Sequence, residues 1–195
     1  MQISEQSRRG FVDLLSTREL LVFVFMAVIF ILASQPITDP DFWWHLSTGQ
    51  YIVEMRSVPH TDIFSTLRFG SEWVTHEWLS EVIIYSIFGT LGYGGLIATF
   101  SLLIVAAFWI VYQRCRNFGV NSYVTGFAVL LGAVATMPTW GVRPQMFSLL
   151  LASIFINLLD RYARREAMPS IWWLAPLMIL WVNLHAGFAL GLALI

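Results

Sequence analysis

Thr38-Asp39-Pro40-Asp41-Phe42-Trp43-Trp44-His45 opens a polar loop that extends to Glu81 and lies between two long apolar segments. The loop 38–81 holds three of the four histidines and seven of the twelve carboxylates of the chain: Asp39, Asp41, Glu54, Asp62, Glu72, Glu77 and Glu81. Most of the remaining sequence is apolar, so we expect most of the chemistry of this protein to take place in the loop.

The first part of the loop predicts a helix that lies at a membrane surface. Asp39 is a suitable N-cap for a helix that begins with Pro40 and continues to about Met55. Asp41 falls in the first turn, where the helix dipole favours an anion, and His45 follows four residues later on the same face. A separate apolar stripe suits contact with lipid and consists of Phe42, Trp43, Leu46 and Val53.

The second part of the loop predicts an extended segment followed by another surface helix. Residues 63–74 have the pattern of an extended segment, with a small hairpin that turns at Gly70-Ser71. A helix then covers about 76–88, with Glu77 and Glu81 on one side of it. Four glycines end this helix before the next apolar run: Gly89, Gly92, Gly94 and Gly95.

The composition is that of a membrane protein. Hydrophobic residues make up 57% of the chain and charged residues only 12%, about half the share found in soluble domains. No basic patch suggests a nucleic-acid partner, and a single cysteine excludes an internal disulfide. We therefore predict an all-α polytopic membrane protein with about five to six transmembrane helices, at 20–37, 96–112, 122–140, 146–159, 171–182 and after Gly187.

The distribution of arginines predicts the topology. All eleven basic residues are arginines; eight lie in the N-terminal segment 1–19, after the second span and after the fourth, and three lie in the alternate loops. The positive-inside rule therefore places 1–19 in the cytoplasm and the loop 38–81 outside. Because the chain ends in an apolar run, we expect the multi-span domain 20–195 to be truncated at its C-terminus, as the first part of a longer protein.

The fourth and fifth spans are short, with fourteen and twelve residues, and Pro176 interrupts the fifth. A full crossing of the ~30 Å hydrocarbon core needs more, so we expect their outer ends to stop below the external surface. The residues at these ends would then line a recess partway into the membrane: Arg143, Gln145, Asn183 and His185. Polar groups at that depth are costly unless they face a wet cavity or one another, so the recess indicates a site.

Two carboxylates at the start of the loop are candidates for catalysis or metal binding. Asp41 is suited either to act as a general base or to hold a divalent metal such as Mg²⁺ or Mn²⁺, with His45 beside it. A helix dipole partner is the structural alternative. Asp39 is better explained as the helix cap, with metal binding as its alternative role.

The other candidates also have structural alternatives. Arg143 suits a phosphate, which a guanidinium binds through two hydrogen bonds, or equally a lipid head group or a loop carboxylate. His76-Glu77 lacks the second histidine of a zinc-protease motif, which would fall at Ser80, and helix capping or solvation competes with a substrate contact. Asn183 and His185 could simply satisfy a break between two helices.

The sequence contains five motifs: Asp-Pro-Asp-x-Trp-Trp-His at 39–45, Pro-His-Thr-Asp-x-Phe-Ser at 59–65, Trp-x-x-His-Glu-Trp-Leu at 73–79, Arg-Pro-Gln-x-Phe at 143–147 and Trp-x-Asn-Leu-His-Ala-Gly-Phe at 181–188. Together they resemble the N-terminal half of bacterial polytopic membrane proteins of the GT-C glycosyltransferase superfamily, which includes protein O-mannosyltransferases, aminoarabinose transferases and oligosaccharyltransferases. The resemblance implies a bacterial inner-membrane protein with an acidic catalytic or metal-binding residue in its first external loop, at Asp41 or, as second choice, Asp39. It also implies a polyprenyl-phosphate-linked or polyprenyl-pyrophosphate-linked sugar as donor.

The leading functional hypothesis is therefore an inverting sugar transfer at the external face. Asp41 and His45 would be catalytic, and Arg143 would neutralise the leaving phosphate. The other substrate-binding residues would be Gln145, Asn183, His185, His76 and Glu77. A non-catalytic accessory subunit that binds other membrane subunits and lipids is the alternative. A transporter is a weaker third reading, because the sequence has no internal repeat.

Overall fold

The computed structural model describes residues 16–165 and 171–195, and all regular structure within these ranges is helical. This confirms the predicted all-α class. The helices in chain order are α1 Thr17–Ala33, α2 Phe42–Met55, α3 Trp78–Asn117, α4 Ser122–Thr136, η3 Met137–Thr139, α5 Gln145–Ala163, η4 Ile171–Trp173, α6 Leu174–Leu184 and α7 Phe188–Leu194.

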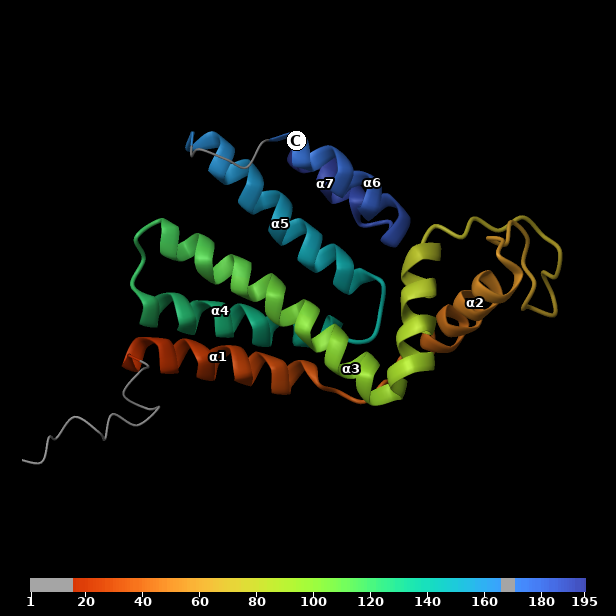
Figure 1. The fold of residues 1–195 in the computed structure, drawn as a ribbon, viewed down its shortest axis with the longest axis horizontal. Helices are drawn as coiled ribbons and strands as arrows, with labels where there is room; N and C mark the ends of the chain where they lie inside the picture. The colour runs from red at the N-terminus through yellow and green to blue at the C-terminus, as the bar shows by residue number, and fades with distance from the viewer. Residues whose placement is uncertain (1–15, 166–170) are drawn as a thin grey trace, which may run out of the picture.

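The helices form a bundle with a separate polar end. Figure 1 shows α1, α4, α5 and the second half of α3 running side by side, with α6 and α7 beyond α5. Contacts of α3 with α1, α4 and α5 hold the bundle together. The loop, α2 and the first half of α3 lie at one end, opposite the start of α1. The arginines at the start of α1 and at the ends of α3 and α5 gather at the other end.

Three helical segments are long and apolar enough to cross a membrane: Trp78–Asn117, Ser122–Thr139 and Gln145–Ala163. A shorter apolar helical segment covers Ile171–Leu184. Only 28% of each long apolar window is buried inside the protein, so most of these surfaces face outward. Apolar helix surfaces of this extent suit lipid, and the chain is a membrane-associated helical protein.

Two expectations about short spans are wrong. The fourth span does not stop after fourteen residues, because α5 begins at Gln145 and continues through its polar last turn to Ala163, nineteen residues in all. Pro176 does not interrupt α6, because it lies in the first helical turn, where its missing N–H has no intrahelical partner to lose. The recess therefore cannot be explained by a short fourth helix.

The predicted glycine break lies at Gly92. Its φ of 64° and ψ of −163° are open to glycine but not to other residues, and they divide α3 into two helical halves. The other three glycines of this group remain inside the helix. The first half packs against α2 and the second half against α1, α4 and α5.

The loop between α2 and α3 folds back on itself around a single antiparallel bridge between Thr61 and Glu72. Gly70, with a φ of 78°, donates its N–H to the carbonyl of Asp62 at the turn. The predicted hairpin at 70–71 is therefore a turn closed by one bridge rather than by two strands. The helix before it starts at Phe42, two residues later than expected, and Asp39 Oδ1 accepts the N–H of Asp41 at 3.1 Å.

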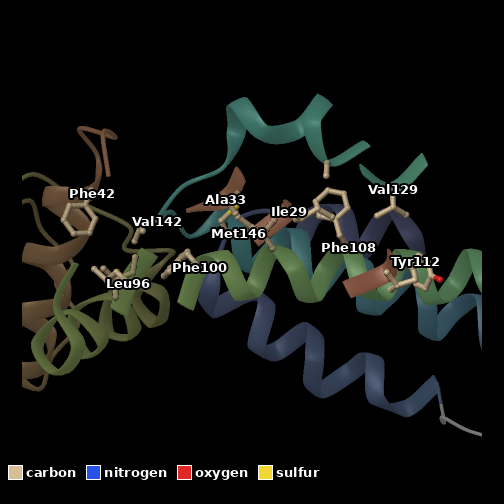
Figure 2. Packing of buried hydrophobic residues seen from close by; sticks show 14 residues of the cluster. Ile29, Ala33, Phe42, Leu96, Phe100, Phe108, Tyr112, Val129, Val142 and Met146 are labelled. Carbon is tan, nitrogen blue, oxygen red and sulfur yellow. The ribbon is translucent and has the colours of Figure 1, made fainter. Parts of the chain in front are cut away.

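The main apolar cluster runs along the inside of the bundle (Figure 2). Ile29 and Ala33 from α1 meet Phe100 and Phe108 from α3, and Met146 adds the start of α5. Small residues allow close packing in membrane helices: a side-chain carbon at Gly126 would overlap the ring of Phe25. The same cluster includes Phe42 and Val142, so the polar end is fixed to the bundle by packing.

Gly49 sets the distance between α2 and α3. A Cβ atom at this position would overlap the backbone carbonyl of Glu81 and would lie 2.9 Å from Tyr85 Cβ. Since backbone cannot move aside as a flexible side chain can, Gly49→Ala should push the helices apart and cost about 1–3 kcal/mol. Thermal unfolding in detergent measures the loss. Gly132→Ala in α4, where open space surrounds the new methyl group, should cause no loss of stability and serves as control.

Candidate functional site

Residues from four separate parts of the chain meet at the polar end of the bundle. The start of α2 supplies His45, the start of α3 supplies Glu77 and Glu81, the segment before α5 supplies Arg143, and the end of α6 supplies His185. The sequence predicted that most of these residues would converge. The structure confirms the convergence, but it pairs the side chains differently.

Arg143 binds the two carboxylates at the start of the loop. Its Nε contacts Asp39 Oδ2, and its Nη2 lies 3.6 Å from Asp41 Oδ2. The side chain of Asp39 is only 13% exposed, whereas that of Asp41 is 56% exposed. Among the alternatives for Arg143, the structure therefore shows the salt bridge to loop carboxylates. Asp41 keeps an open face, and Arg143 itself stays about one third exposed.

His45 points toward α3. Its Nδ1 lies 3.3 Å from Glu81 Oε1 and 3.8 Å from Glu77 Oε2, and the residue is only 4% exposed. Asp41 instead contacts Arg143. Although the two residues are one helical turn apart, they do not form the expected pair, because the packing of α2 on α3 buries one and leaves the other at the surface.

Glu77 is the centre of a cluster of three histidines. Its Oε1 lies 3.4 Å from His185 Nε2 and 3.5 Å from His76 Nε2, while its Oε2 faces His45. Solvation or helix capping was the simpler expectation, but Glu77 is 9% exposed and makes no side-chain capping bond. It therefore joins the loop, α2 and the α6 end in one contact group.

Burial raises the pKa of Glu77 above its ordinary value of 4.5. The nearby charges of His45 and His76 act in the opposite direction, and the carboxylates of Glu81 and Asp41 add to the rise. The charged form is penalised because a partly dry environment solvates it poorly. Glu77 is consequently a group that can exchange a proton nearer neutral pH than an ordinary glutamate can.

The break between α6 and α7 fixes the orientation of His185. Its Nδ1 accepts the N–H of Gly187 at 2.9 Å and lies 2.7 Å from Ser148 Oγ, which accepts the indole N–H of Trp181. With Nδ1 used as an acceptor, the proton of neutral His185 is on Nε2, which faces Glu77. Hydrogen bonds from Trp181 through Ser148 thus fix His185 at the helix break, and His185 in turn contacts Glu77.

Asn183 also links the α6 end to α3. Its Oδ1 accepts the indole N–H of Trp78 at 2.9 Å, and its Nδ2 donates to the carbonyl of Ile179. Nearby, Ser80 Oγ donates to the carbonyl of Leu184 at 2.6 Å. These bonds hold the end of α6 against α3. Asn183 therefore has the structural role that was expected as its alternative.

Two predicted residues remain at the edge of the site. Gln145 is the first residue of α5, half-buried, and no side-chain hydrogen bond to the described residues involves it. His76 is about half exposed and touches Glu77. Neither is held as firmly as His45 or His185, so both are better placed to contact a bound molecule than to support the fold.

Sequence reasoning missed Glu81 and Ser148 as site residues. Glu81 is fully buried, and its Oε2 has no hydrogen-bond partner in the part of the chain that the structure describes. Its spacing of four residues from Glu77 was a usable signal, because it places both carboxylates on one helix face, and such a face is either exposed to solvent or part of a site. Ser148 had no signal, since a serine inside an apolar helix is common.

The site has few features of a metal centre. Among residues 16–165 and 171–195, no group of three or more His, Cys, Asp or Glu side chains is arranged to hold a metal ion. Asp39 and Asp41, the predicted ligands, share Arg143 as their cation. What the arrangement offers instead is an exposed carboxylate beside a guanidinium, and a buried carboxyl group among histidines.

Glu77→Gln tests the electrostatic cost of this buried carboxyl group. Because the folded pKa exceeds the unfolded value of 4.5, the stability linked to the proton of Glu77 is complete below pH 4.5 and is lost as the pH rises through the folded pKa. We expect the free energy of unfolding of the wild type to fall as the pH rises from 4.5 through the folded pKa of Glu77, and that of the neutral variant Glu77→Gln to fall less.

Thermal unfolding in detergent between about pH 4 and about pH 8 measures this difference. Glu72→Gln is the matched control, because Glu72 is an exposed carboxylate of the same loop. Identical pH profiles for wild type and Glu77→Gln would show that the carboxyl group is not buried as described.

Comparison of the chain with protein-family models, curated proteins and solved structures found no match. The functional reading consequently depends on the geometry of the site and on the motifs in the sequence.

Proposed function

We propose that this chain carries the external active site of a membrane glycosyltransferase that uses a polyprenyl-phosphate-linked or polyprenyl-pyrophosphate-linked sugar. One observation supports this most directly: Asp41 presents a half-exposed carboxylate 3.6 Å from the guanidinium of Arg143, at the end of the bundle opposite the arginine-rich helix ends. A base and an anion-binding cation side by side match the two needs of such a transfer.

In the proposed step, an acceptor hydroxyl attacks the anomeric carbon of the donor sugar. Asp41 takes the hydroxyl proton, the new carbon–oxygen bond forms, and the bond from the anomeric carbon to the phosphate oxygen breaks with its electron pair on the phosphate. Arg143 turns its exposed face to that developing charge. A single displacement of this kind inverts the configuration at the anomeric carbon.

His45, Glu77 and Glu81 act as positioning residues in this proposal. Because His45 is buried against Glu81, its role is to hold α2, and with it Asp41, on α3 rather than to meet the substrate. In this proposal His76, Gln145, His185 and Asn183 would line the acceptor side. A divalent metal held by Asp39 and Asp41 would require Arg143 to move away, so we assign the charge stabilisation to the guanidinium.

The placement of arginines supports an orientation for this function. Arg18, Arg114, Arg116 and Arg161 lie at the helix ends far from the loop, which favours a cytoplasmic N-terminus and an external site in a bacterial inner membrane. A lipid-linked donor would then reach the site from the outer leaflet.

A non-catalytic accessory subunit is the second candidate, and a specific observation favours it. The side chains of the site are largely occupied with one another: Arg143 contacts Asp39 and Asp41, and His45 contacts Glu81. A site that kept its scaffold and lost its chemistry would look similar. Stable co-purification with other membrane subunits, without any bound lipid phosphate, would support this reading.

Asp41→Asn and Asp39→Asn separate the two candidates. If Asp41 is the base, Asp41→Asn should slow release of polyprenyl phosphate from a polyprenyl-phosphate hexose by about 10²–10⁴-fold without changing the unfolding temperature. Asp39→Asn should instead destabilise the fold by about 1–3 kcal/mol, because it removes the closest partner of Arg143.

The assay uses membranes that contain the protein, which supply the native acceptor, and native mass spectrometry records bound lipid phosphate. Wild-type turnover by Asp41→Asn would exclude this residue as the base. Absence of release by the wild-type protein, together with a partner at fixed stoichiometry, would favour the accessory role.

A further inference from the structure

A groove lies at the end of the bundle opposite the site described above. It has a volume of about 470 Å³, within the range of small-molecule sites, and lies between the start of α1 and the end of α3. Its lining residues are Ser16, Arg18, Glu19, Val22, Phe23, Met26, Trp109, Tyr112 and Gln113.

Polarity changes along the groove in the same direction on both helices. On α1 the polar residues occupy positions 16–19, and the apolar ones follow one and two turns deeper at Val22 and Met26. On α3, which runs antiparallel beside it, Gln113 is at the end and Trp109 lies deeper. The lining therefore extends over about 15 Å of helix from a charged mouth to an apolar interior.

The mouth carries one cation and one anion. Arg18 is exposed, and no salt bridge joins its guanidinium to a residue of 16–165 or 171–195. Glu19 Oε2 accepts the backbone N–H of Ser16 at 2.8 Å and the hydroxyl of Ser16 at 2.9 Å, and the first of these bonds completes the capping box of α1. Its other carboxylate oxygen remains for a ligand cation.

The apolar wall contains a polar atom without a partner. Tyr112 is 3% exposed, and its hydroxyl makes no hydrogen bond with the described part of the chain. Its ring stacks on that of Trp109 at a centroid distance of 5.6 Å, so the two aromatic residues form one surface of the groove.

We propose that this groove binds a membrane phospholipid whose head group carries a phosphate and an ammonium, as phosphatidylethanolamine does. Arg18 binds the phosphate, Glu19 binds the ammonium, and an acyl chain lies along Val22, Met26 and Trp109. The opposite charges at the mouth match a zwitterion, whereas a purely anionic head group would meet the carboxylate of Glu19 unpaired.

Native mass spectrometry of the delipidated protein, titrated with phosphatidylethanolamine or with phosphatidylglycerol of the same acyl chains, tests the proposal. We expect the wild type to prefer phosphatidylethanolamine. Arg18→Gln should weaken binding of both lipids about tenfold, because a charge-assisted bond to phosphate is lost. Arg68→Gln, an arginine of the distant loop, is the control and should change neither affinity.

Glu19→Gln isolates the ammonium contact. Glutamine completes a capping box as glutamate does, so α1 should keep its start while the negative charge is lost. The preference for phosphatidylethanolamine should then disappear. Two results would overturn the proposal. One is that both lipids bind equally and Arg18→Gln changes neither affinity, which would mean annular lipid only. The other is that Glu19→Gln keeps the preference for phosphatidylethanolamine. Circular dichroism confirms that each variant is folded.

Discussion

The polar end of this protein depends on the burial of Glu77 among His45, His76 and His185. A carboxyl group removed from water needs polar neighbours, and here imidazole nitrogens from α2, from the loop and from the α6 end lie 3.4–3.8 Å from its oxygens. The burial of one side chain thereby draws together segments that are more than a hundred residues apart in sequence. The bonds from Trp78 to Asn183 and from Ser80 to Leu184 strengthen the same junction.

Features that depend on local backbone chemistry could be predicted from the sequence. The glycine-rich break was expected before the second span, and Gly92 adopts the conformation that only glycine accepts readily. The two loop helices and the all-α class followed from caps and from hydrophobic periodicity. Boundaries shifted by a few residues, as at Phe42, and the prediction that Asp39 is the N-cap is wrong: Asp41 occupies that position without a side-chain capping bond, while Asp39 accepts the N–H of Asp41 in a turn before the helix.

The pairing of side chains could not be predicted in the same way. Helical spacing placed Asp41 and His45 on one face, but spacing says nothing about which neighbour lies across that face. The close approach of α2 to α3 at Gly49 decides that His45 meets Glu81, and no local pattern encodes this contact. The short fifth span and the break after it were expected, and they bring Asn183 and His185 to the site; the fourth span, in contrast, is a full-length helix.

The kink at Gly92 has a consequence for how deeply α3 enters the bilayer. A helix break leaves backbone N–H and C=O groups without intrahelical partners, and each such group would cost several kcal/mol in hydrocarbon. The break is therefore stable where water, lipid head groups or other parts of the protein satisfy these groups, and not where it faces lipid tails. The segment 93–117 that follows is about 38 Å long, but its last residues, from Gln113, are polar, so its apolar part is about 30 Å long and matches the apolar thickness of a bilayer.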